Sequence, residues 1–336
     1  MSSMKKDIQN IAIVRLSALG DIVNSAFVLQ FIKAAYPHAK ISWIVEESFS
    51  DILSSAKYLD TITSINLKAL KHDKSFARLK SEIAKLKTDT EYDIVIDMQG
   101  LIKSAVVARI LGKNTHGFDK NSTREGVAAL LYRTKTAIPY EENVILRNAK
   151  VVSDALGIAI TEDIIQNKEA VFEATKEFLL QKEKANVAFV IGASWPSKIY
   201  PKEQIAQVCA ALDVEAHIIW GNEAELREAE WIVANTQNAT LAPKCNLREL
   251  VSFISHMDLL IGNDTGPTHI AWAQNIPSIT LLGPTTERMI GKTSQNVGVK
   301  SPSKVNLLKI DKNDYSIKDI KPQNIIKKAK ELLHGV

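Results

Sequence analysis

Short apolar runs recur along the chain, and each is followed by a stretch with helical periodicity. Apolar runs of this length are typical of parallel strands that are buried on both faces, and strands separated by helices form βαβ units with right-handed crossovers. The sequence therefore predicts an α/β protein built on parallel sheets. The predicted strands are 11–16, 41–45, 93–97, 187–191, 217–220, 259–261 and 278–282.

The pattern divides the chain into two halves. Between about 161 and 184 the strand signal disappears and charged residues of helical type dominate, after which the alternation restarts. A length of 336 residues also suits two domains. We expect two Rossmann-like domains facing across a cleft, 1–165 and 166–320, and a final helix within 321–336 that packs back toward the first domain. The other predicted helices are 22–36, 101–111, 202–212, 223–234, 247–255 and 268–274, with a helix and a mobile loop in 67–87.

Composition limits the partners and the compartment. The net charge of +4 is too small to indicate a nucleic-acid coat protein, although it allows a basic groove for an anionic substrate or membrane surface. Cys209 and Cys245 are too few for a disulfide framework or a Cys-rich metal site. No run approaches the roughly 18 apolar residues of a membrane span, and no signal-peptide core is recognised. We expect a cytoplasmic protein with peripheral membrane contact at most.

The loop after the first predicted strand carries the first candidate side chain. Ligands of open α/β sheets bind beyond the carboxyl ends of the strands, so such loops are examined first. Gly20 permits a tight turn and Asp21 lies at the helix start, where it either caps the helix or serves a ligand. The loop holds one glycine and no G-x-G-x-x-G pattern, which disfavours NAD binding.

A loop in the second half suits a phosphate. The amides of Thr265 and Gly266 lie at the positive end of the helix that Pro267 begins. Asp264 suits sugar hydroxyls better than a phosphate. His269 is either a ligand or a histidine buried in the core.

Two further loops of the second half add a cation and an acid. Lys198 either neutralises a phosphate or is a solvated surface lysine. Glu225 either binds both hydroxyls of a ribose or stabilises the first turn of a helix. A cation, a helix N-terminus and a ribose-type carboxylate, with an acid in the first half, together suit a nucleotide-sugar transferase.

The loops, taken in order with two more motifs, resemble the heptosyltransferase family, inverting glycosyltransferases of GT-B fold (glycosyltransferase family 9). The two motifs are W-I-V-E-E at 43–47 and D-M-Q-G-L-I-K-S-A at 97–105. Both are most similar to the type that adds the first heptose of the lipopolysaccharide inner core. Its donor is ADP-L-glycero-β-D-manno-heptose and its acceptor is the Kdo of Kdo-lipid A, with no metal and no cofactor.

The resemblance also implies roles for individual residues. It makes Asp21 the general base that activates the acceptor hydroxyl. It places Ser194 and Lys198 at the diphosphate, Glu225 at the ribose, the main chain of Cys245 at adenine, Thr265 and Gly266 at phosphate, and Asp264 and His269 near the heptose and diphosphate. The residues expected on the acceptor side are Lys68, Lys71, Lys74, Arg78, Lys103 and Arg124.

The implied partners are ADP-heptose, Kdo-lipid A and the cytoplasmic leaflet of the inner membrane, and no nucleic acid. Three alternatives remain open at this stage. A type II heptosyltransferase would need an acceptor that already carries heptose. A nucleotide-sugar epimerase of the same build would alter the donor with no acceptor present. A non-catalytic module would bind the donor without turnover.

Overall fold

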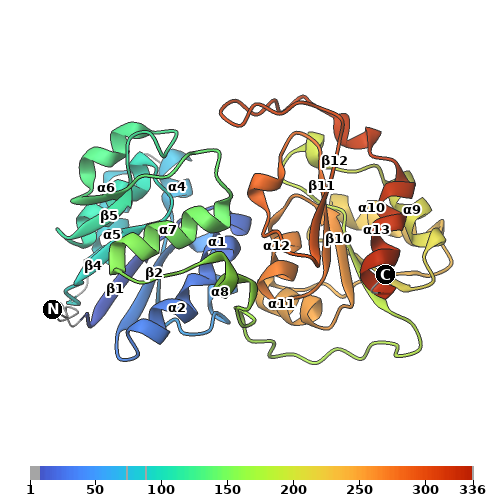
Figure 1. The fold of residues 1–336 in the computed structure, drawn as a ribbon, viewed down its shortest axis with the longest axis horizontal. Helices are drawn as coiled ribbons and strands as arrows, with labels where there is room; N and C mark the ends of the chain where they lie inside the picture. The colour runs from blue at the N-terminus through green and yellow to red at the C-terminus, as the bar shows by residue number, and fades with distance from the viewer. Residues whose placement is uncertain (1–7, 73–74, 88, 335–336) are drawn as a thin grey trace. The chain divides into compact units, whose positions relative to one another are not determined.

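The computed structural model describes residues 8–72, 75–87 and 89–334, which form two compact units (Figure 1). The amino-terminal unit is 1–171 and the carboxyl-terminal unit is 172–336, so the division falls six residues beyond position 165. Each unit is built on a six-stranded sheet in which every strand pair is parallel. The predicted α/β class is confirmed.

The sheet of the amino-terminal unit has the order β3-β2-β1-β4-β5-β6. The connections β1→β2 and β4→β5 run in opposite directions, so right-handed crossovers place their helices on opposite faces. Its strands are β1 (Asn10–Val14), β2 (Lys40–Glu46), β3 (Thr61–Ile65), β4 (Ile94–Asp97), β5 (Thr115–Phe118) and β6 (Thr134–Thr136). Its helices are α1 (Leu19–Ala26), α2 (Val28–Ala35), η1 (Glu47–Phe49), α3 (Ser50–Leu53), α4 (Leu67–His72), α5 (Phe76–Leu86), α6 (Ile102–Leu111), η2 (Gly126–Leu131), α7 (Val144–Leu156) and α8 (Glu162–Gln166).

The sheet of the carboxyl-terminal unit has the order β12-β11-β10-β7-β8-β9. Its strands are β7 (Asn186–Val190), β8 (Glu215–Ile219), β9 (Ala239–Leu241), β10 (Leu259–Asn263), β11 (Ser278–Leu282) and β12 (Asn296–Lys300). Its helices are η3 (Pro196–Lys198), α9 (Lys202–Ala211), α10 (Glu223–Ala234), α11 (Leu247–Ser255), α12 (Gly266–Ala273), η4 (Glu287–Met289), η5 (Ser316–Asp319) and α13 (Pro322–His334).

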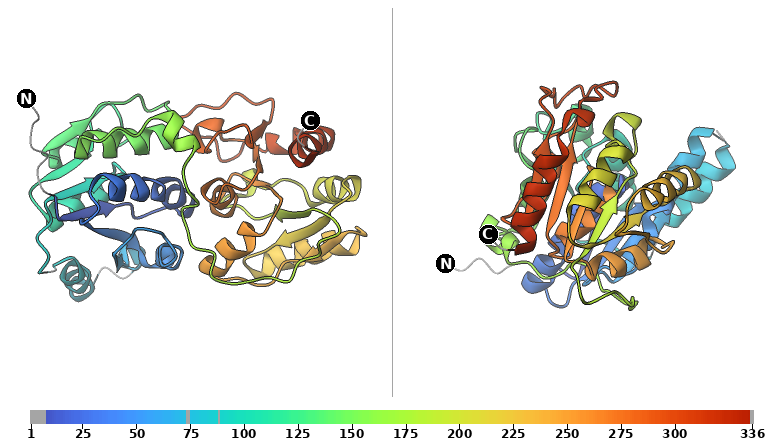
Figure 2. Two further views of the ribbon diagram at one scale, coloured as in Figure 1. Left: turned by 60° about the horizontal axis from the view of Figure 1, so that its bottom comes forward. Right: turned by 90° about the vertical axis from the view of Figure 1, so that its right-hand side faces the viewer.

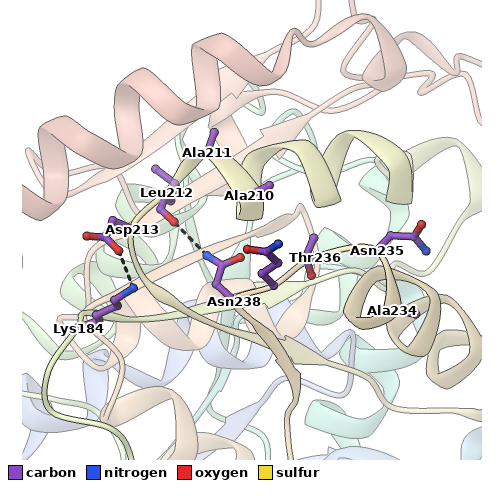
Figure 3. A pocket seen from close by; sticks show the side chains of 10 residues that line it. Lys184, Ala210, Ala211, Leu212, Asp213, Ala234, Asn235, Thr236 and Asn238 are labelled. Atoms are coloured by element: carbon purple, nitrogen blue, oxygen red, sulfur yellow. Dashed lines mark hydrogen bonds and ion pairs between the residues drawn. The ribbon is translucent and has the colours of Figure 1, made fainter.

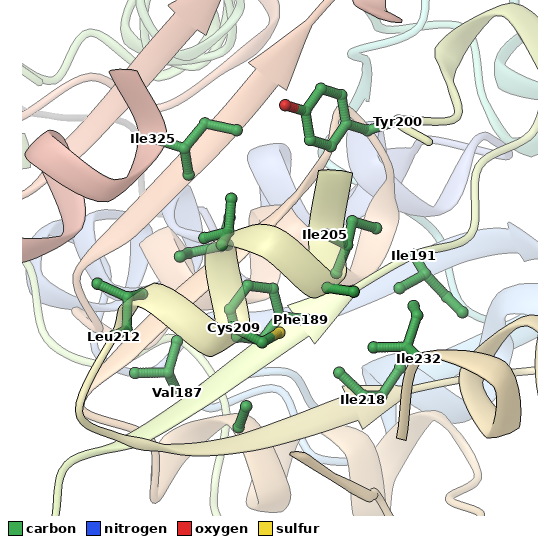
Figure 4. Packing of buried hydrophobic residues seen from close by; sticks show 14 of the residues in the cluster. Val187, Phe189, Ile191, Tyr200, Ile205, Cys209, Leu212, Ile218, Ile232 and Ile325 are labelled. Atoms are coloured by element: carbon green, nitrogen blue, oxygen red, sulfur yellow. The ribbon is translucent and has the colours of Figure 1, made fainter. Parts of the chain in front are cut away.

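The core of the carboxyl-terminal unit accounts for the place of its last helix. Figure 4 shows Phe189 and Ile218 of the sheet packed with Cys209 of α9 and Ile325 of α13. α13 packs against α9, β10 and β11 (Figures 1 and 2), and Ile325 and Ala329 are fully buried there. The apolar stripe of α13 is therefore buried within its own unit, and packing of segment 321–336 toward the first domain stays a prediction.

Two other predicted helices differ from the structure. The helix predicted over 22–36 is two helices that meet at Phe27, and the first begins at Leu19, ahead of Asp21. Of the charged stretch 161–184, only α8 is helical, and the residues that follow have no regular helix. The stretch 67–87 holds two helices, α4 and α5.

Candidate active site

The predicted site residues follow the carboxyl ends of strands in the two sheets. All strands of a sheet run the same way, so the loops that follow them gather at one edge. In the amino-terminal unit these loops follow β1, β3, β4 and β5, and carry Asp21, Lys68, Lys103 and Arg124. In the carboxyl-terminal unit they follow β7, β8, β9 and β10, and carry Ser194, Lys198, Glu225, Cys245, Asp264, Thr265, Gly266 and His269.

Asp21 is the third residue of α1 rather than its cap. The cap position is Ala18, whose backbone N–H donates to Asp21 Oδ2 at 3.2 Å. Asp21 Oδ1 forms an ion pair with Arg15 Nη2 at 2.9 Å, and the Asp21 side chain remains 27% exposed. The carboxylate therefore stabilises the helix start, as the capping alternative requires, and is still accessible to a ligand.

Arg15 is the site residue that the sequence analysis missed. It follows β1 directly, is buried, and donates from Nη1 to the carbonyl oxygen of Met98 while Nη2 pairs with Asp21. A buried guanidinium needs partners because burying an unpaired charge is costly. The signal was available: Arg15 is the one charged residue in the apolar run 11–16, and Asp21 is the acid of the loop that follows.

The loop after β4 is joined to the Asp21 loop. Gln99 Oε1 accepts from the backbone N–H of Leu16 at 2.9 Å, and Gln99 Nε2 donates to Ser17 Oγ at 3.4 Å. Lys103 Nζ lies 3.3 Å from the same hydroxyl. The motif at 97–105 thus supports the loop that carries Asp21, and it brings the predicted Lys103 to that loop.

Asp97 fixes the conformation of the loop after β4 through hydrogen bonds. It is fully buried and accepts from the backbone N–H groups of Gln99 and Gly100 and from the hydroxyl of Tyr132 at 2.6 Å. Burial raises the pKa of Asp97, and these hydrogen bonds only partly oppose that effect. Asp97 is therefore a positioning group inside the unit.

The other predicted acceptor-side residues differ in their surroundings. Arg124 is exposed in the loop after β5, and the neighbouring Thr123 hydroxyl donates to the carbonyl oxygen of Gly100. Lys68 Nζ donates to Ser48 Oγ at 3.0 Å and lies over the ring of Phe49. These residues follow β2 and β3, whereas Lys103 and Arg124 follow β4 and β5. Arg78 is exposed on α5. The side chain of Lys71 and the whole of Lys74 lie outside the described residues.

In the carboxyl-terminal unit three predicted residues form one buried cluster. Lys198 Nζ lies 2.9 Å from Asp264 Oδ2, and His269 Nε2 lies 3.1 Å from Asp264 Oδ1. The three side chains are 10%, 5% and 7% exposed, in the order Lys198, Asp264 and His269. Lys198 is therefore no solvated surface lysine, and His269 is no histidine of an apolar core. Both oxygens of Asp264 are engaged by the cation and the imidazole.

The charge of the cluster is set by competing effects on Asp264. Burial opposes ionisation, but the ammonium of Lys198 and the hydrogen bond from His269 outweigh it, and the pKa of Asp264 lies well below its usual range. Asp264 is thus an anion that holds Lys198 and His269 in place. A contact of Asp264 with sugar hydroxyls stays a prediction.

The loop of the cluster is held by its own side chains. Asn263 donates to the carbonyl oxygen of Ile191 and accepts from the backbone N–H of Tyr200, joining the loops that follow β10 and β7. Thr268 Oγ1 donates to the carbonyl oxygen of Asn263 at 2.6 Å. α12 begins after Thr265, whose side chain makes no capping hydrogen bond. Pro267 has no N–H and the N–H of Thr268 donates to the carbonyl oxygen of Thr265, so Thr265 and Gly266 are the residues whose N–H groups can serve an anion at this helix start.

Glu225 lies at the edge of a cavity of about 410 Å³. Its carboxylate accepts from Gly221 N–H at 2.7 Å and from Asn222 Nδ2 at 2.9 Å. A Cβ on Gly192 would lie 2.3 Å from Glu225 Oε1, so only glycine lets the carboxylate approach the loop after β7 this closely. The predicted ribose contact and the helix-start role are both compatible with this geometry.

The two remaining predicted residues carry no special geometry. Ser194 is exposed in the loop after β7. Cys245 is half-buried just before α11, and burial, followed by the nearby Glu249, raises the pKa of its thiol to about 11. The thiol is therefore neutral, which suits the expectation that Cys245 contributes only main chain.

Comparisons with known proteins agree with this arrangement. The family described as glycosyltransferase family 9 (heptosyltransferase) matches residues 82–316. Lipopolysaccharide heptosyltransferase 1 of Campylobacter coli is 39% identical and is aligned over 96% of this chain and 98% of its own. The chain belongs to glycosyltransferase family 9. Lipopolysaccharide heptosyltransferase 1 of Escherichia coli K12 is 25% identical, over 90% of this chain and 96% of its own.

A solved structure extends the family assignment to the fold. The structure described as E. coli heptosyltransferase WaaC with ADP superposes with a TM-score of 0.81, at 22% identity, over 96% of this chain and all of the other. The family 9 chain therefore has the GT-B fold that the motifs led us to expect.

A second hollow of this family 9 chain lies away from the site. It encloses about 680 Å³ near the starts of β8 and β9 (Figure 3), at the sheet edge opposite the loops described above. Its polar groups bond to one another: Lys184 pairs with Asp213 at 2.7 Å, and Asn238 donates to the carbonyl oxygen of Leu212 at 2.9 Å. Volume alone therefore does not mark the site.

Two features are absent from the residues that the structure describes. No group of three or more His, Cys, Asp or Glu side chains is arranged to hold a metal ion. No helix within the same residues has the length and apolar character that crossing a bilayer requires.

Proposed function

We propose that this protein transfers L-glycero-D-manno-heptose from ADP-heptose to the Kdo of Kdo-lipid A, the first heptose addition of the lipopolysaccharide inner core. The observation that carries the proposal is the 39% identity to lipopolysaccharide heptosyltransferase 1 of Campylobacter coli over nearly the full length of both chains. A structure of the E. coli relative with ADP-2-deoxy-2-fluoro heptose supports the choice of donor.

The carboxyl-terminal cluster supplies the chemistry of the leaving group. When the bond from the anomeric carbon to the β-phosphate oxygen breaks, negative charge grows on ADP and has to be stabilised. The ammonium of Lys198, fixed by Asp264, and the backbone N–H of Gly266 at the start of α12 offer positive charge. We infer that these groups take the role that a metal ion plays elsewhere, so that transfer is metal-independent.

Asp21 supplies the base. A direct displacement with inversion requires a proton acceptor on the attacking acceptor hydroxyl, and an ionised carboxylate can take that proton. The side chain of Asp21 is accessible, and its contacts with Arg15 and with the backbone N–H of Ala18 restrict the orientation of the carboxylate. The reaction requires that closure of the two units bring Asp21 to the anomeric carbon and exclude water, which limits hydrolysis of the donor.

The acceptor explains the basic residues at the carboxyl edge of the amino-terminal sheet. Kdo-lipid A carries carboxylates and phosphates, which Lys103, Arg124 and Lys68 can neutralise. Because that acceptor is anchored in a bilayer by its lipid, we propose that the protein works at the cytoplasmic face of the inner membrane through peripheral contact.

A transfer assay tests the proposal. Purified protein is incubated with ADP-heptose and either Kdo-lipid A or the acceptor that already carries one heptose, and products are weighed by mass spectrometry. We expect a gain of one heptose on Kdo-lipid A and none on the other acceptor. The reverse preference would favour a type II enzyme, and an altered donor without acceptor would favour an epimerase. Folded protein that binds ADP-heptose but gives no product would overturn the proposal.

A further inference from the structure

Helix α6 is apolar on both sides, although only one side is covered. Ala105 and Ala108 are buried toward the sheet. Ile102, Val106 and Ile110, spaced four residues apart, form a stripe on the opposite side, and Val106 at its centre is 43% exposed. A helix that is apolar all round is normally buried on every side, so the outer stripe of α6 calls for a partner.

The stripe continues onto neighbouring segments. α6 packs against η2 through Ala105 and Ala128, and η2 exposes Val127 and Leu130, the latter to 82%. α6 also packs against α5, whose first residue, Phe76, is strongly exposed. Exposed apolar side chains on segments that pack against one another favour an interaction site. The α6 face is defined here by Ile102, Val106, Ile110, Val127, Leu130 and Phe76.

The charges around the α6 face are mostly basic, and the exposed acid Glu125 beside it is engaged by the backbone N–H of Ile102 at 2.8 Å. α6 carries Lys103 and Arg109 and no acid, and η2 carries no charged residue. α5 adds the basic residues Arg78, Lys80 and Lys85, while its one acid, Glu82, is buried and paired with Lys85. Apolar side chains surrounded by basic ones are the pattern of segments that lie in the interface of an anionic bilayer.

We propose that the α6 face docks the protein on an anionic lipid bilayer, with its apolar side chains entering the headgroup region and its basic side chains contacting lipid phosphates. The proposal rests on the proposed function only in that the acceptor is itself embedded in a bilayer. The stripe begins at Ile102, at the carboxyl end of β4, next to Lys103 and the Asp21 loop. Docking on this face therefore brings the acceptor-side loops to the lipid surface.

Charge also argues against a second copy of the chain as the occupant. Two copies meeting through the α6 face would bring two sets of basic side chains together with no exposed acid on α5, α6 or η2 to pair with them. Like charges brought together across an interface weaken association. An anionic bilayer has the opposite sign, so the same side chains favour docking on it.

Flotation with vesicles tests the proposal on the full chain. Vesicles of phosphatidylcholine alone are compared with vesicles containing about one third phosphatidylglycerol, at low and high salt. The test variant is Val106→Glu with Leu130→Glu. The matched control is Leu179→Glu with Leu308→Glu, which adds the same charge at exposed apolar positions of the other unit. Unfolding curves confirm that both variants are folded.

We expect the wild type and the control to float with the anionic vesicles, less so at high salt, and the test variant to bind at least about tenfold more weakly. Equal binding of test variant and wild type, or no binding of the wild type, would overturn the proposal. A wild-type dimer that the test variant disrupts would overturn it in favour of self-association.

A second readout separates this proposal from the proposed function. Heptose transfer to an acyl-free Kdo acceptor needs no bilayer, so the test variant should keep the wild-type rate with it. Loss of vesicle binding with that rate intact supports the α6 face as the docking surface. If the wild type shows no transfer to either acceptor but binds vesicles as expected, the proposed function fails and the docking surface stands.

Discussion

The two sheets place an ion pair at equivalent points and use it differently. In each sheet the strand order reverses beside the unit's first strand, between β1 and β4 in one unit and between β7 and β10 in the other. Such a switch point is where open α/β sheets bind ligands. The amino-terminal unit places Arg15 with Asp21 there, and the carboxyl-terminal unit places Lys198 with Asp264.

The difference lies in the exposure of the anion, since the two cations are about equally buried. Both carboxylates have both oxygens engaged, but the side chain of Asp21 is 27% exposed and that of Asp264 only 5%. The same pairing thus presents a carboxylate in one unit and fixes a cation in the other. The more exposed anion, Asp21, suits a base for the acceptor. The buried anion, Asp264, instead holds Lys198 as a positive site for the leaving group.

The largest effect is expected for Asp264→Asn. Without this anion, Lys198 keeps a charge at a site that is nearly sealed from water, and breaking such a pair costs about 3–5 kcal/mol in the free energy of unfolding. ADP affinity should fall as well, because Lys198 and His269 lose the group that positions them. Urea unfolding and calorimetric titration with ADP measure the two effects.

A companion variant separates stability from binding. Lys198→Met with Asp264→Leu removes both charges, so most of the stability should return. ADP binding should stay weak, because the cation is gone. Recovery of ADP affinity in this double variant would show that Lys198 does not contact the donor.

A smaller effect is expected for Arg15→Met, which keeps the volume of the side chain but frees the Asp21 carboxylate. Transfer should slow about 10- to 100-fold through loss of orientation, while ADP affinity stays unchanged because the donor lies in the other unit. Arg15→Lys should recover part of the rate. An Arg15→Met enzyme with wild-type turnover would show that the pair only stabilises the fold.

The smallest effect concerns pH and the amino-terminal unit. Burial lowers the pKa of His116 to about 4, against 6.5 in an unfolded chain. Between about pH 4 and 6.5 the histidine is therefore protonated in the unfolded state and neutral in the folded state. The free energy of unfolding falls as pH drops through this window, by at most about 3 kcal/mol. His116→Gln should flatten this slope in urea titrations at several pH values.

The Lys198–Asp264 pair should respond to acid in a different pH range. Because the pKa of Asp264 is held below its usual range, its contribution persists through the same window and is lost only as pH falls below about 4. A wild-type slope that survives in His116→Gln would assign the acid sensitivity to another group.

The sequence predicted the interior of each sheet better than its edges. The predicted strands all correspond to strands of the structure, and five strands were missed. Four of them, β3, β6, β9 and β12, are the sheet edges, and the fifth is β5, an interior strand whose sequence Thr-His-Gly-Phe has no continuous apolar run. The edge strands are partly exposed and carry more polar residues, so they lack the continuous apolar run that marked the others; β3 is Thr-Ile-Thr-Ser-Ile and β6 is Thr-Lys-Thr. The break at Phe27 also has no proline or glycine to announce it.

The site was predicted as a set of residues and not as a set of contacts. Loop positions after strands identified Asp21, Lys198 and Asp264, because parallel strands dictate where such loops gather. Spacing along the chain could not show that Lys198 and Asp264, 66 positions apart, pair with each other. Arg15 was passed over because it lies among strand residues, where side chains are expected to pack rather than to act.

The central claim, that Asp21 is the base and the other unit holds the donor, is tested most directly by Asp21→Asn. Asp60→Asn is the matched control, since Asp60 also pairs with a cation, Lys33, and accepts from a backbone N–H, that of Ile41. Transfer and ADP affinity are measured on the same preparations. The account predicts about 10²- to 10⁴-fold slower transfer for Asp21→Asn alone, with unchanged ADP affinity. Transfer at the wild-type rate, or a loss of ADP affinity that matches the loss of transfer, would contradict it.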